Sequence, residues 1–166
     1  MGKLENLFIR YVTENKESIY RLAYSYVKNP DDALDIVQDS IHKAISSIRT
    51  IKNPGAMKSW FYRIVVNISL DFLRKQNKVY ILDKEVLESV SPGTDDAYHD
   101  IDLERALDDL PPKYRSVIVL RYFEDMKIEE ISEVLDENVN TIKTRLYQAL
   151  RLLRVKMKDE SIEEVK

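Results

Sequence analysis

The stretch that decides the fold of this chain is residues 127–158, which read KIEEISEVLDENVNTIKTRLYQALRLLRVKMK. Its first part predicts a short helix over about 127–135, because apolar residues recur there at helical spacing: Ile128, Ile131 and Leu135. A turn over 136–139 follows, and Asn140 is expected to cap a longer helix over about 141–158. The inward residues of this longer helix are Ile142, Leu146, Leu150 and Leu153. The order of short helix, tight turn and longer helix indicates a helix-turn-helix.

The longer helix leaves polar and basic side chains on the positions that its apolar stripe does not use. These are Lys143, Thr144, Arg145, Tyr147, Gln148 and Arg151. A helix that reads DNA needs this division, with aliphatic residues toward its own domain and donors toward base edges and phosphates. The alternative is an ordinary helical hairpin with a basic exposed helix, since the turn lacks the glycine that often marks such motifs. The pattern therefore favours a DNA-binding segment.

The first half of the chain predicts three helices. One covers about 4–27, with a polar stretch in its middle that bends or breaks it. Asn29 and Pro30 suit the cap and first position of a helix over about 30–48, whose inward residues are Ala33, Val37, Ile41, Ala44, Ile45 and Ile48. A third helix begins near Ser59 and ends in basic residues near 78, with one apolar stripe formed by Trp60, Ile64, Ile68 and Phe72.

Residues 79–101 lose this periodicity and include a run of turn-forming residues over 91–96. Helical periodicity returns over about 103–110 and again after Pro112, before the helix-turn-helix. We find no strand pattern that competes. The sequence therefore predicts an all-α chain of two small helical domains, residues 1–78 and 102–166, joined by a flexible acidic linker over 79–101.

Net charge conceals an uneven distribution of charged residues. The whole chain of 166 residues carries a formal charge of −3. Residues 1–78 hold 13 Lys or Arg against 8 Asp or Glu, whereas residues 79–103 hold one Lys and seven acids. Residues 138–158 hold six basic residues and no acid. An acidic connector thus separates two locally basic domains, although solvated helix faces alone would give similar charge runs.

Two further segments have a composition that suits binding. Residues 57–75 interleave aromatic and basic residues beside a Pro-Gly loop, as in proteins that grip single-stranded nucleic acid. Aromatic residues at helical spacing more often pack in a core, which is the alternative for Trp60, Phe61 and Phe72. The segment from Asp31 to Asp39 places acids opposite its apolar stripe, either to dock a basic partner or simply as a solvated face.

The composition argues against several classes of function. There are no cysteines and only two histidines, which lie far apart, so disulfides, thiolate ligands and an HExxH zinc site are not expected. With three glycines the chain has no Gly-rich phosphate loop. No apolar run approaches the roughly 20 residues that cross a bilayer, and no signal peptide is recognisable. We expect no catalytic site, metal, cofactor or small-molecule substrate, and a cytoplasmic location.

These segments occur in an order that resembles the extracytoplasmic-function (ECF) family of sigma factors. Residues 32–39, 59–67 and 71–75 (DALDIVQD, SWFYRIVVN and DFLRK) resemble region 2 of that family. Residues 110–115, 120–124, 128–131 and 141–150 (LPPKYR, LRYFE, IEEI and TIKTRLYQAL) resemble region 4. The resemblance covers nearly the whole chain outside the linker. Within the family the chain is most similar to the sigma-V type of low-GC Gram-positive bacteria.

The resemblance implies a non-catalytic subunit of bacterial RNA polymerase that selects promoters. Binding to the β′ clamp helices of the polymerase is implied for Asp35, Gln38 and Asp39. The β flap of the polymerase is a further implied contact. Contact with the −10 element is implied for Trp60, Arg63, Asn67, Arg74 and Lys75. Reading of the −35 element is implied for Lys143, Thr144, Tyr147 and Gln148, with Arg145 and Arg151 on the DNA backbone.

The resemblance also implies a regulator and a setting. An anti-sigma factor, often membrane-anchored, would cover the polymerase-binding faces until a stress signal arrives. The implied targets are promoters of a cell-envelope stress regulon. The implied partners are core RNA polymerase, promoter DNA and the anti-sigma factor.

The chain departs from the family pattern at four positions. Ser132 replaces the usual Ala, Asp136 and Asn140 replace the usual Gly, and Gln148 replaces a common Arg. The first three bear on the geometry of the turn, and the fourth on the −35 preference.

Rival interpretations are a stand-alone helix-turn-helix regulator and a pure interaction module. The first lacks an obvious dimer seam, and the second leaves the basic helix unexplained.

Overall fold

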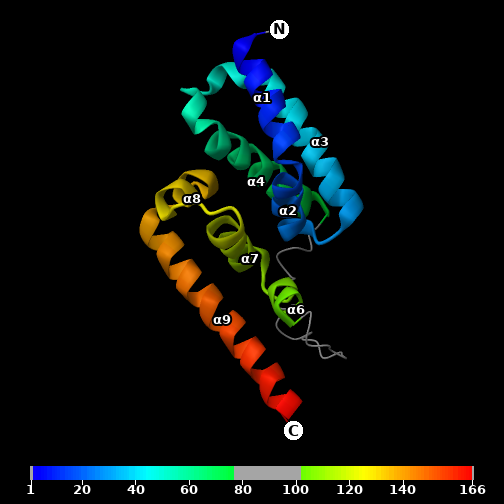
Figure 1. The fold of residues 1–166 in the computed structure, drawn as a ribbon, viewed down its shortest axis with the longest axis vertical. Helices are drawn as coiled ribbons and strands as arrows, with labels where there is room; N and C mark the ends of the chain where they lie inside the picture. Colours follow the sequence, from blue (N-terminus) through cyan, green and yellow to red (C-terminus); the bar gives the residue numbers. More distant parts are fainter. Residues whose placement is uncertain (1, 77–101, 166) are drawn as a thin grey trace.

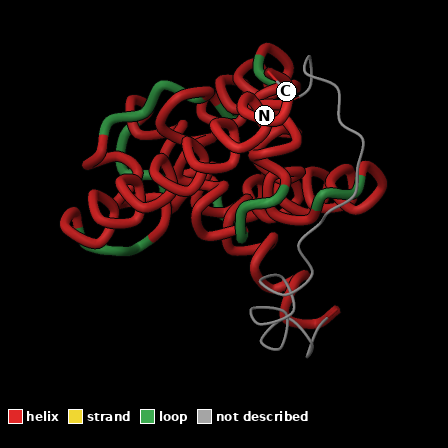
Figure 2. The backbone as a smooth tube through the Cα atoms, turned by 90° about the horizontal axis from the view of Figure 1, so that it is seen from below, coloured by secondary structure: helices red, strands yellow, loops and turns green. Residues whose placement is uncertain are grey.

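The structure is a computed structural model that describes residues 2–76 and 102–165, and these residues contain helices and no strand (Figures 1 and 2). The predicted linker at 79–101 lies outside the described residues. The first domain comprises α1 (Lys3–Glu14), α2 (Lys16–Val27), α3 (Pro30–Ser46), η1 (Ile48–Thr50), η2 (Pro54–Ala56) and α4 (Met57–Gln76). The second comprises α6 (Asp102–Asp108), α7 (Pro112–Ile118), η4 (Val119–Phe123), α8 (Ile128–Leu135) and α9 (Val139–Val165). The all-α prediction is confirmed.

Local signals place the ends of the first helices. The break predicted within residues 4–27 falls at Asn15, whose side-chain Nδ2 donates to the Tyr11 carbonyl oxygen at 2.8 Å and so ends α1. Asn29 caps α3 as predicted, because its Oδ1 accepts the Asp32 amide at 2.9 Å. Pro30 occupies the first turn of that helix, where a missing N–H costs nothing.

The core of the first domain lies where α2, α3 and α4 meet. Its fully buried side chains include Phe8, Ile19, Leu22, Ile36, Phe61 and Val65. Three serines are buried with them, one on each of these helices. The hydroxyls of Ser25, Ser40 and Ser69 donate to a carbonyl of their own helix at 2.6, 2.7 and 2.8 Å. These small, internally satisfied residues let the helix backbones approach closely without an unpaired polar group.

Two of the predicted inward faces are corrected by the structure. Ile45 is 44% exposed, and α3 instead buries Ile36 and Ser40 together with Ala33 and Ala44. In α4 the stripe from Trp60 to Phe72 is only half-buried. The buried face lies one residue further along the helix, at Phe61, Val65, Ser69 and Leu73. The buried side of each helix is set by its neighbours, because α3 packs against α2 and α4, and α4 packs against α2, α3 and α8. The buried arc is therefore centred where these neighbours meet the helix and not on the predicted stripe.

The second domain wraps short helices around the first half of α9. Figure 1 shows α9 running past α8, α7 and α6 toward the C-terminus. Between α7 and α8 the chain makes the π-type turn η4, which follows directly on α7. A residue in the left-handed region, Asp125 with φ 57°, then redirects the backbone toward α8. Such π turns are single-turn features that reorient side chains.

The two domains pack against each other, with α4 along α8 and α2 along α7 and η4 (Figure 1). Arg115 of α7 lies in this interface and is only 5% exposed. Its guanidinium donates to the carbonyls of Leu107, at 3.2 Å, and Leu110, at 2.7 Å, and across the interface to the Ser25 carbonyl. A buried guanidinium is tolerated because its donors are satisfied in this way.

Lys28 makes a second polar contact across the same interface. This residue ends α2 in the left-handed region, with φ 53°, and its Nζ donates to the Asp108 carbonyl at 2.5 Å. Burial lowers the pKa of Lys28, and the nearby charge of Arg115 lowers it further. Among the described residues, no helix is long and apolar enough to span a bilayer.

Candidate nucleic-acid interface

The turn between α8 and α9 is held by its own polar side chains. Asp136 adopts φ 57° and ψ 45°, the left-handed conformation that usually favours glycine. The Ser132 hydroxyl donates to the Glu137 carbonyl at 2.5 Å and joins the end of α8 to the turn. Asn138 accepts the Thr141 amide on its Oδ1 at 2.8 Å. The predicted cap at Asn140 is therefore wrong: Asn138 caps α9, and Asn140 lies in its first turn.

The face of α9 that was predicted to read DNA is turned to solvent. Lys143, Thr144, Tyr147, Gln148 and Arg151 are exposed, and Tyr147 reaches 66%. Ile142 and Ala149 are buried on the other side, and Leu146, Leu150 and Leu153 are half-buried. This separation of aliphatic and polar faces confirms the predicted orientation of the helix.

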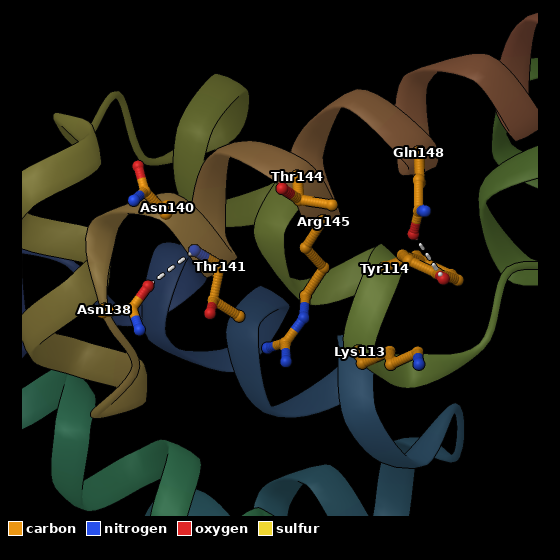
Figure 3. A pocket seen from close by; sticks show the side chains of 8 residues that line it. All are labelled: Lys113, Tyr114, Asn138, Asn140, Thr141, Thr144, Arg145 and Gln148. Carbon is orange, nitrogen blue, oxygen red and sulfur yellow. Dashed lines mark hydrogen bonds between the residues drawn. The ribbon is translucent and has the colours of Figure 1, made fainter.

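A polar pocket of about 390 Å³ opens beside this face (Figure 3). Its walls combine the turn and first half of α9 with the start of α7: Lys113, Tyr114, Asn138, Asn140, Thr141, Thr144, Arg145 and Gln148. Arg145 is partly buried here, and its Nη2 lies 3.6 Å from the Glu137 carboxylate. The Tyr114 hydroxyl donates to Oε1 of Gln148 at 2.9 Å.

The α7 side of this pocket was not anticipated from the sequence. Lys113 and Tyr114 were recognised only as part of a family motif, because nothing local predicts which helix will flank the start of α9. The Lys113 ammonium lies over the Tyr114 ring, 5.0 Å from its centroid. This cation–π contact places a second basic group beside the polar face of α9.

The polar residues of α4 form one exposed stripe. Arg63, Asn67 and Arg74 share a face of the helix with Asp71, and all four are exposed. Arg74 forms an ion pair with Asp71, and Arg63 lies 3.5 Å from the carboxylate of Asp136 in the second domain. The first residue of the stripe thus lies against the turn that precedes α9. Lys75 is also exposed, at the end of α4.

Trp60 lies near the start of α4, beside the segment over residues 50–56. Its Nε1 donates to the Thr50 hydroxyl at 3.0 Å, and its ring meets Phe8 edge-on at 6.0 Å. The side chain is half-buried, whereas Phe61 is fully buried. The core alternative is therefore correct for Phe61, while part of Trp60 stays accessible beside the loop.

The acidic face of α3 is fully accessible. Asp35, Gln38 and Asp39 are exposed and lie on the same helix as Leu34, an exposed leucine at 53%. An apolar groove of about 440 Å³ borders this helix, between α3 and the junction of α1 with α2. The groove could not be predicted from the sequence, because it is formed by residues of three helices: Val12, Thr13, Lys16, Glu17, Ile19, Tyr20, Leu34, Val37 and Ile41.

Residues 2–76 and 102–165 form helices without a strand, and they present the polar face of α9 on a helix-turn-helix. This arrangement is typical of DNA-binding regulators of transcription. Two family models match the chain: Sigma-70 region 2 over residues 11–79, and Sigma-70, region 4 over residues 100–153. The chain is 54% identical to the RNA polymerase sigma factor SigV of Bacillus subtilis over 156 residues, covering 94% of each chain. It is 32% identical to the ECF RNA polymerase sigma factor SigW of the same organism, covering 93% of this chain and 91% of SigW. The chain therefore belongs to the sigma-70 family and, within it, to the ECF sigma factors.

Solved structures share the fold. The sigma factor RpoE of Bartonella quintana, in complex with the anti-sigma factor NepR, matches with a TM-score of 0.72 at 22% identity, covering 91% of this chain and 96% of RpoE. CnrH, in complex with the cytosolic domain of CnrY, matches with a TM-score of 0.66 at 22% identity, covering 92% of this chain and 88% of CnrH. As an ECF sigma factor, the chain is an alternative sigma factor that directs transcription initiation. Sigma factors as a class are not enzymes.

Proposed function

We propose that this chain binds core RNA polymerase through its first domain and directs it to promoters that carry two recognised elements. In this proposal residues 1–78 are region 2, residues 102–166 are region 4, and residues 79–101 link them. The observation that carries the proposal is the exposed polar face of α9, presented by the helix-turn-helix, in one chain with the exposed polar stripe of α4.

The second domain reads the −35 element in the major groove. Lys143, Thr144, Tyr147 and Gln148 contact base edges, while Arg145 and Arg151 hold the DNA backbone. The supporting observation is that five of these six side chains are exposed on one helix whose opposite face is buried. Arg145 exchanges its partner Glu137 for a phosphate, whose oxygens, like those of a carboxylate, can accept two hydrogen bonds from one guanidinium.

The first domain holds the −10 element as a single strand. The segment over residues 52–59, which comprises the loop and the start of α4, receives an unpaired base together with Trp60 and Asn67. Arg63, Arg74 and Lys75 contact phosphates. The partly accessible indole of Trp60 and the exposed stripe of α4 support this assignment. Extrusion of a base costs a few kcal/mol, which contacts to its face and edge offset.

Binding of polymerase uses the acidic face of α3. Asp35, Gln38 and Asp39 contact the β′ clamp helices, and the second domain contacts the β flap. The exposed Leu34 and the apolar groove beside α3 give this face the mixture of charged rim and apolar centre that protein interfaces use.

Regulation is exerted by an anti-sigma factor that is anchored in the membrane, and the chain itself is cytoplasmic. RpoE and CnrH were solved in complex with NepR and with the cytosolic domain of CnrY, which supports a partner of this kind. The regulon responds to cell-envelope stress, and the chain has no catalytic activity of its own.

The described conformation differs from the one that contacts both promoter elements at once. Elements centred near −10 and −35 lie about 25 base pairs apart, which is about 85 Å of duplex at about 3.4 Å per base pair. In the structure Arg63, assigned to the −10 element, is 3.5 Å from Asp136, which directly precedes the segment assigned to the −35 element. The two domains therefore separate when the chain engages a promoter.

The test is run-off transcription of genomic DNA with bacterial core RNA polymerase, with and without the purified chain. Discrete starts that occur only with the chain, and that share two sequence elements when aligned, are the expected result. Co-purification of the chain with core polymerase is measured in parallel. Failure to bind core polymerase or to initiate transcription, while duplex DNA is still bound, would favour the stand-alone helix-turn-helix regulator instead.

A further inference from the structure

A hydrogen bond between two side chains joins α7 to the polar face of α9. The hydroxyl of Tyr114 donates to Oε1 of Gln148 at 2.9 Å, and Figure 3 shows this oxygen turned toward the tyrosine. Both residues line the polar pocket. Tyr114 is half-buried in the first turn of α7, and the Lys113 ammonium lies 5.0 Å from its ring centroid.

The hydrogen bond decides which end of the Gln148 amide is available. A glutamine amide has one carbonyl oxygen that accepts and one NH₂ group that donates twice. Because Tyr114 engages the oxygen, the oxygen faces α7 and the Nε2 group is left for a ligand. Within residues 2–76 and 102–157, no hydrogen bond occupies Nε2. In this conformation Gln148 therefore acts mainly as a donor.

This bias matters because the bases differ in what their major-groove edges offer. Adenine is read by glutamine through two contacts, in which the amide oxygen accepts from N6 and the nitrogen donates to N7. The oxygen keeps a second lone pair, but it is turned toward α7, so this paired contact requires the amide to rotate away from Tyr114. Guanine instead presents two acceptors, N7 and O6, which suit a group that only donates. Cytosine presents a donor and therefore opposes the Nε2 group.

We propose that Tyr114 is a positioning residue that sets the base preference of Gln148, holding its amide as a donor so that guanine is favoured over adenine at the base pair Gln148 faces. The proposal rests on the proposed reading of the −35 element by α9. Tyr114 itself need not touch DNA. Its effect is carried by the orientation of the Gln148 amide.

The test uses the full chain with core RNA polymerase on a promoter obtained from the run-off experiment. Every single base-pair substitution of the −35 element is transcribed by the wild type and by Tyr114→Phe, which removes only the hydroxyl. At one base pair, we expect the ratio of transcription from the guanine promoter to transcription from the adenine promoter to fall in the variant by about 2- to 10-fold. This range corresponds to the free energy of one hydrogen bond. Preferences at the other positions should stay unchanged. A merely structural role of Tyr114 would lower transcription from all promoters alike.

Three further variants make the result unambiguous. Gln148→Ala should remove the preference at the same base pair, and adding Tyr114→Phe to it should then change nothing more. Tyr122→Phe is a matched control, because Tyr122 is 57% exposed and lies outside the pocket.

The possible outcomes separate the two proposals. If Gln148→Ala alters the preference at one base pair but Tyr114→Phe does not, the positioning role is refuted and the −35 contact stands. An adenine preference in the wild type would also refute it. If Gln148→Ala alters no preference anywhere, the proposed −35 contact itself is wrong.

Discussion

The hydroxyl of Tyr62 in the first domain donates a 2.8 Å hydrogen bond to the carboxylate of Glu124 in the second. Glu124 is only 4% exposed, and its other carboxylate oxygen lies 3.1 Å from Nη1 of Arg21. Its backbone carbonyl accepts from Nζ of Lys58 at 2.7 Å. A buried carboxylate is tolerated only with partners such as Tyr62 and Arg21. These two residues and Lys58, which bonds to the backbone carbonyl, all belong to the opposite domain. Glu124, the residue that follows η4, thus joins the second domain to both α2 and α4.

The first prediction is that Glu124→Ala loosens the contact between the domains. The change leaves the Tyr62 hydroxyl and the Arg21 guanidinium without their shared acceptor. Because Arg21 is partly exposed, we expect a loss of about 1–3 kcal/mol in the free energy of unfolding. The measurements are urea unfolding and the inter-domain distance in the free chain, by energy transfer between labels on α3 and α9. We expect a longer mean distance in the variant.

Glu129→Ala is the matched control for this experiment, since Glu129 is exposed on α8. It should change neither the unfolding free energy nor the distance appreciably. If Glu124→Ala behaved like this control, the buried carboxylate would not be what holds the two domains together.

The second prediction concerns alkaline pH. Burial raises the pKa of Tyr11 to about 12, and burial together with Tyr11 and Glu124 raises the pKa of Tyr62. The folded state thus favours neutral phenols over phenolates. The stability that the two neutral phenols contribute is fully present below the ordinary tyrosine pKa of about 10. It is lost as the pH rises through the raised pKa values of the folded state. Stability should therefore decline above about pH 10.

The measurement is the free energy of unfolding as a function of pH, alongside tyrosinate absorbance of the folded chain. Tyr11→Phe keeps the edge-on contact with Phe61, at 6.4 Å, and removes one titrating hydroxyl. This variant should lose less stability than the wild type on going above about pH 10. Equal losses in both proteins would mean that Tyr11 titrates as it does in the unfolded chain.

The helices, the cap of α3 and the helix-turn-helix could be predicted from the sequence because each depends on neighbours within a few residues. Asn29 with Pro30, and the aliphatic spacing of α9, are signals of this kind. The packing of the domains could not be predicted. Glu124 meets residues 62 and 103 positions away along the chain, and no local pattern distinguishes it from an ordinary surface acid.

The wrong prediction of the α9 cap has a local physical reason. Asn138 and Asn140 are both plausible caps, and the choice depends on where the backbone turns. Because Asp136 takes the left-handed conformation immediately after α8, the turn is shorter than expected and α9 begins at Val139. For the candidate site, the polar face of α9 was predictable from spacing. Its contact with Tyr114 was not, since that depends on how α7 packs.

The third prediction tests the left-handed residue of the turn. Asp136 has φ 57°, which a side chain with a Cβ adopts at a cost and glycine adopts freely. Its ion pair with Arg63 is exposed, so its loss should matter little to stability. We expect Asp136→Gly to be neutral or stabilising by up to about 1 kcal/mol, and Asp136→Val to be destabilising by about 1–2 kcal/mol.

The measurement is the thermal unfolding of the wild type, Asp136→Gly and Asp136→Val, which compares their stabilities. The order Gly, Asp, Val from most to least stable is the expected result. Asp125 has the same φ of 57° and allows the glycine substitution to be repeated at an independent site. A valine variant as stable as the glycine variant would show that the turn relaxes out of the left-handed conformation.

The last prediction separates DNA reading from polymerase binding. Lys143→Ala combined with Tyr147→Ala truncates two exposed side chains of α9 and leaves its buried face intact. We expect loss of transcription that depends on the −35 element, with binding to core polymerase unchanged. Asp35→Lys combined with Asp39→Lys reverses the charge of the exposed α3 face. It should weaken co-purification with core polymerase at low salt, where surface charges are least screened.

Both double variants alter only exposed positions, so each should retain the helical content and unfolding midpoint of the wild type, and circular dichroism checks this. The two phenotypes should then be complementary, one defective in promoter choice and the other in assembly. Loss of polymerase binding in the α9 variant would place part of the polymerase contact on that helix. Unchanged co-purification of the α3 variant would remove the acidic face from the interface and leave the neighbouring apolar groove as the surface to test next.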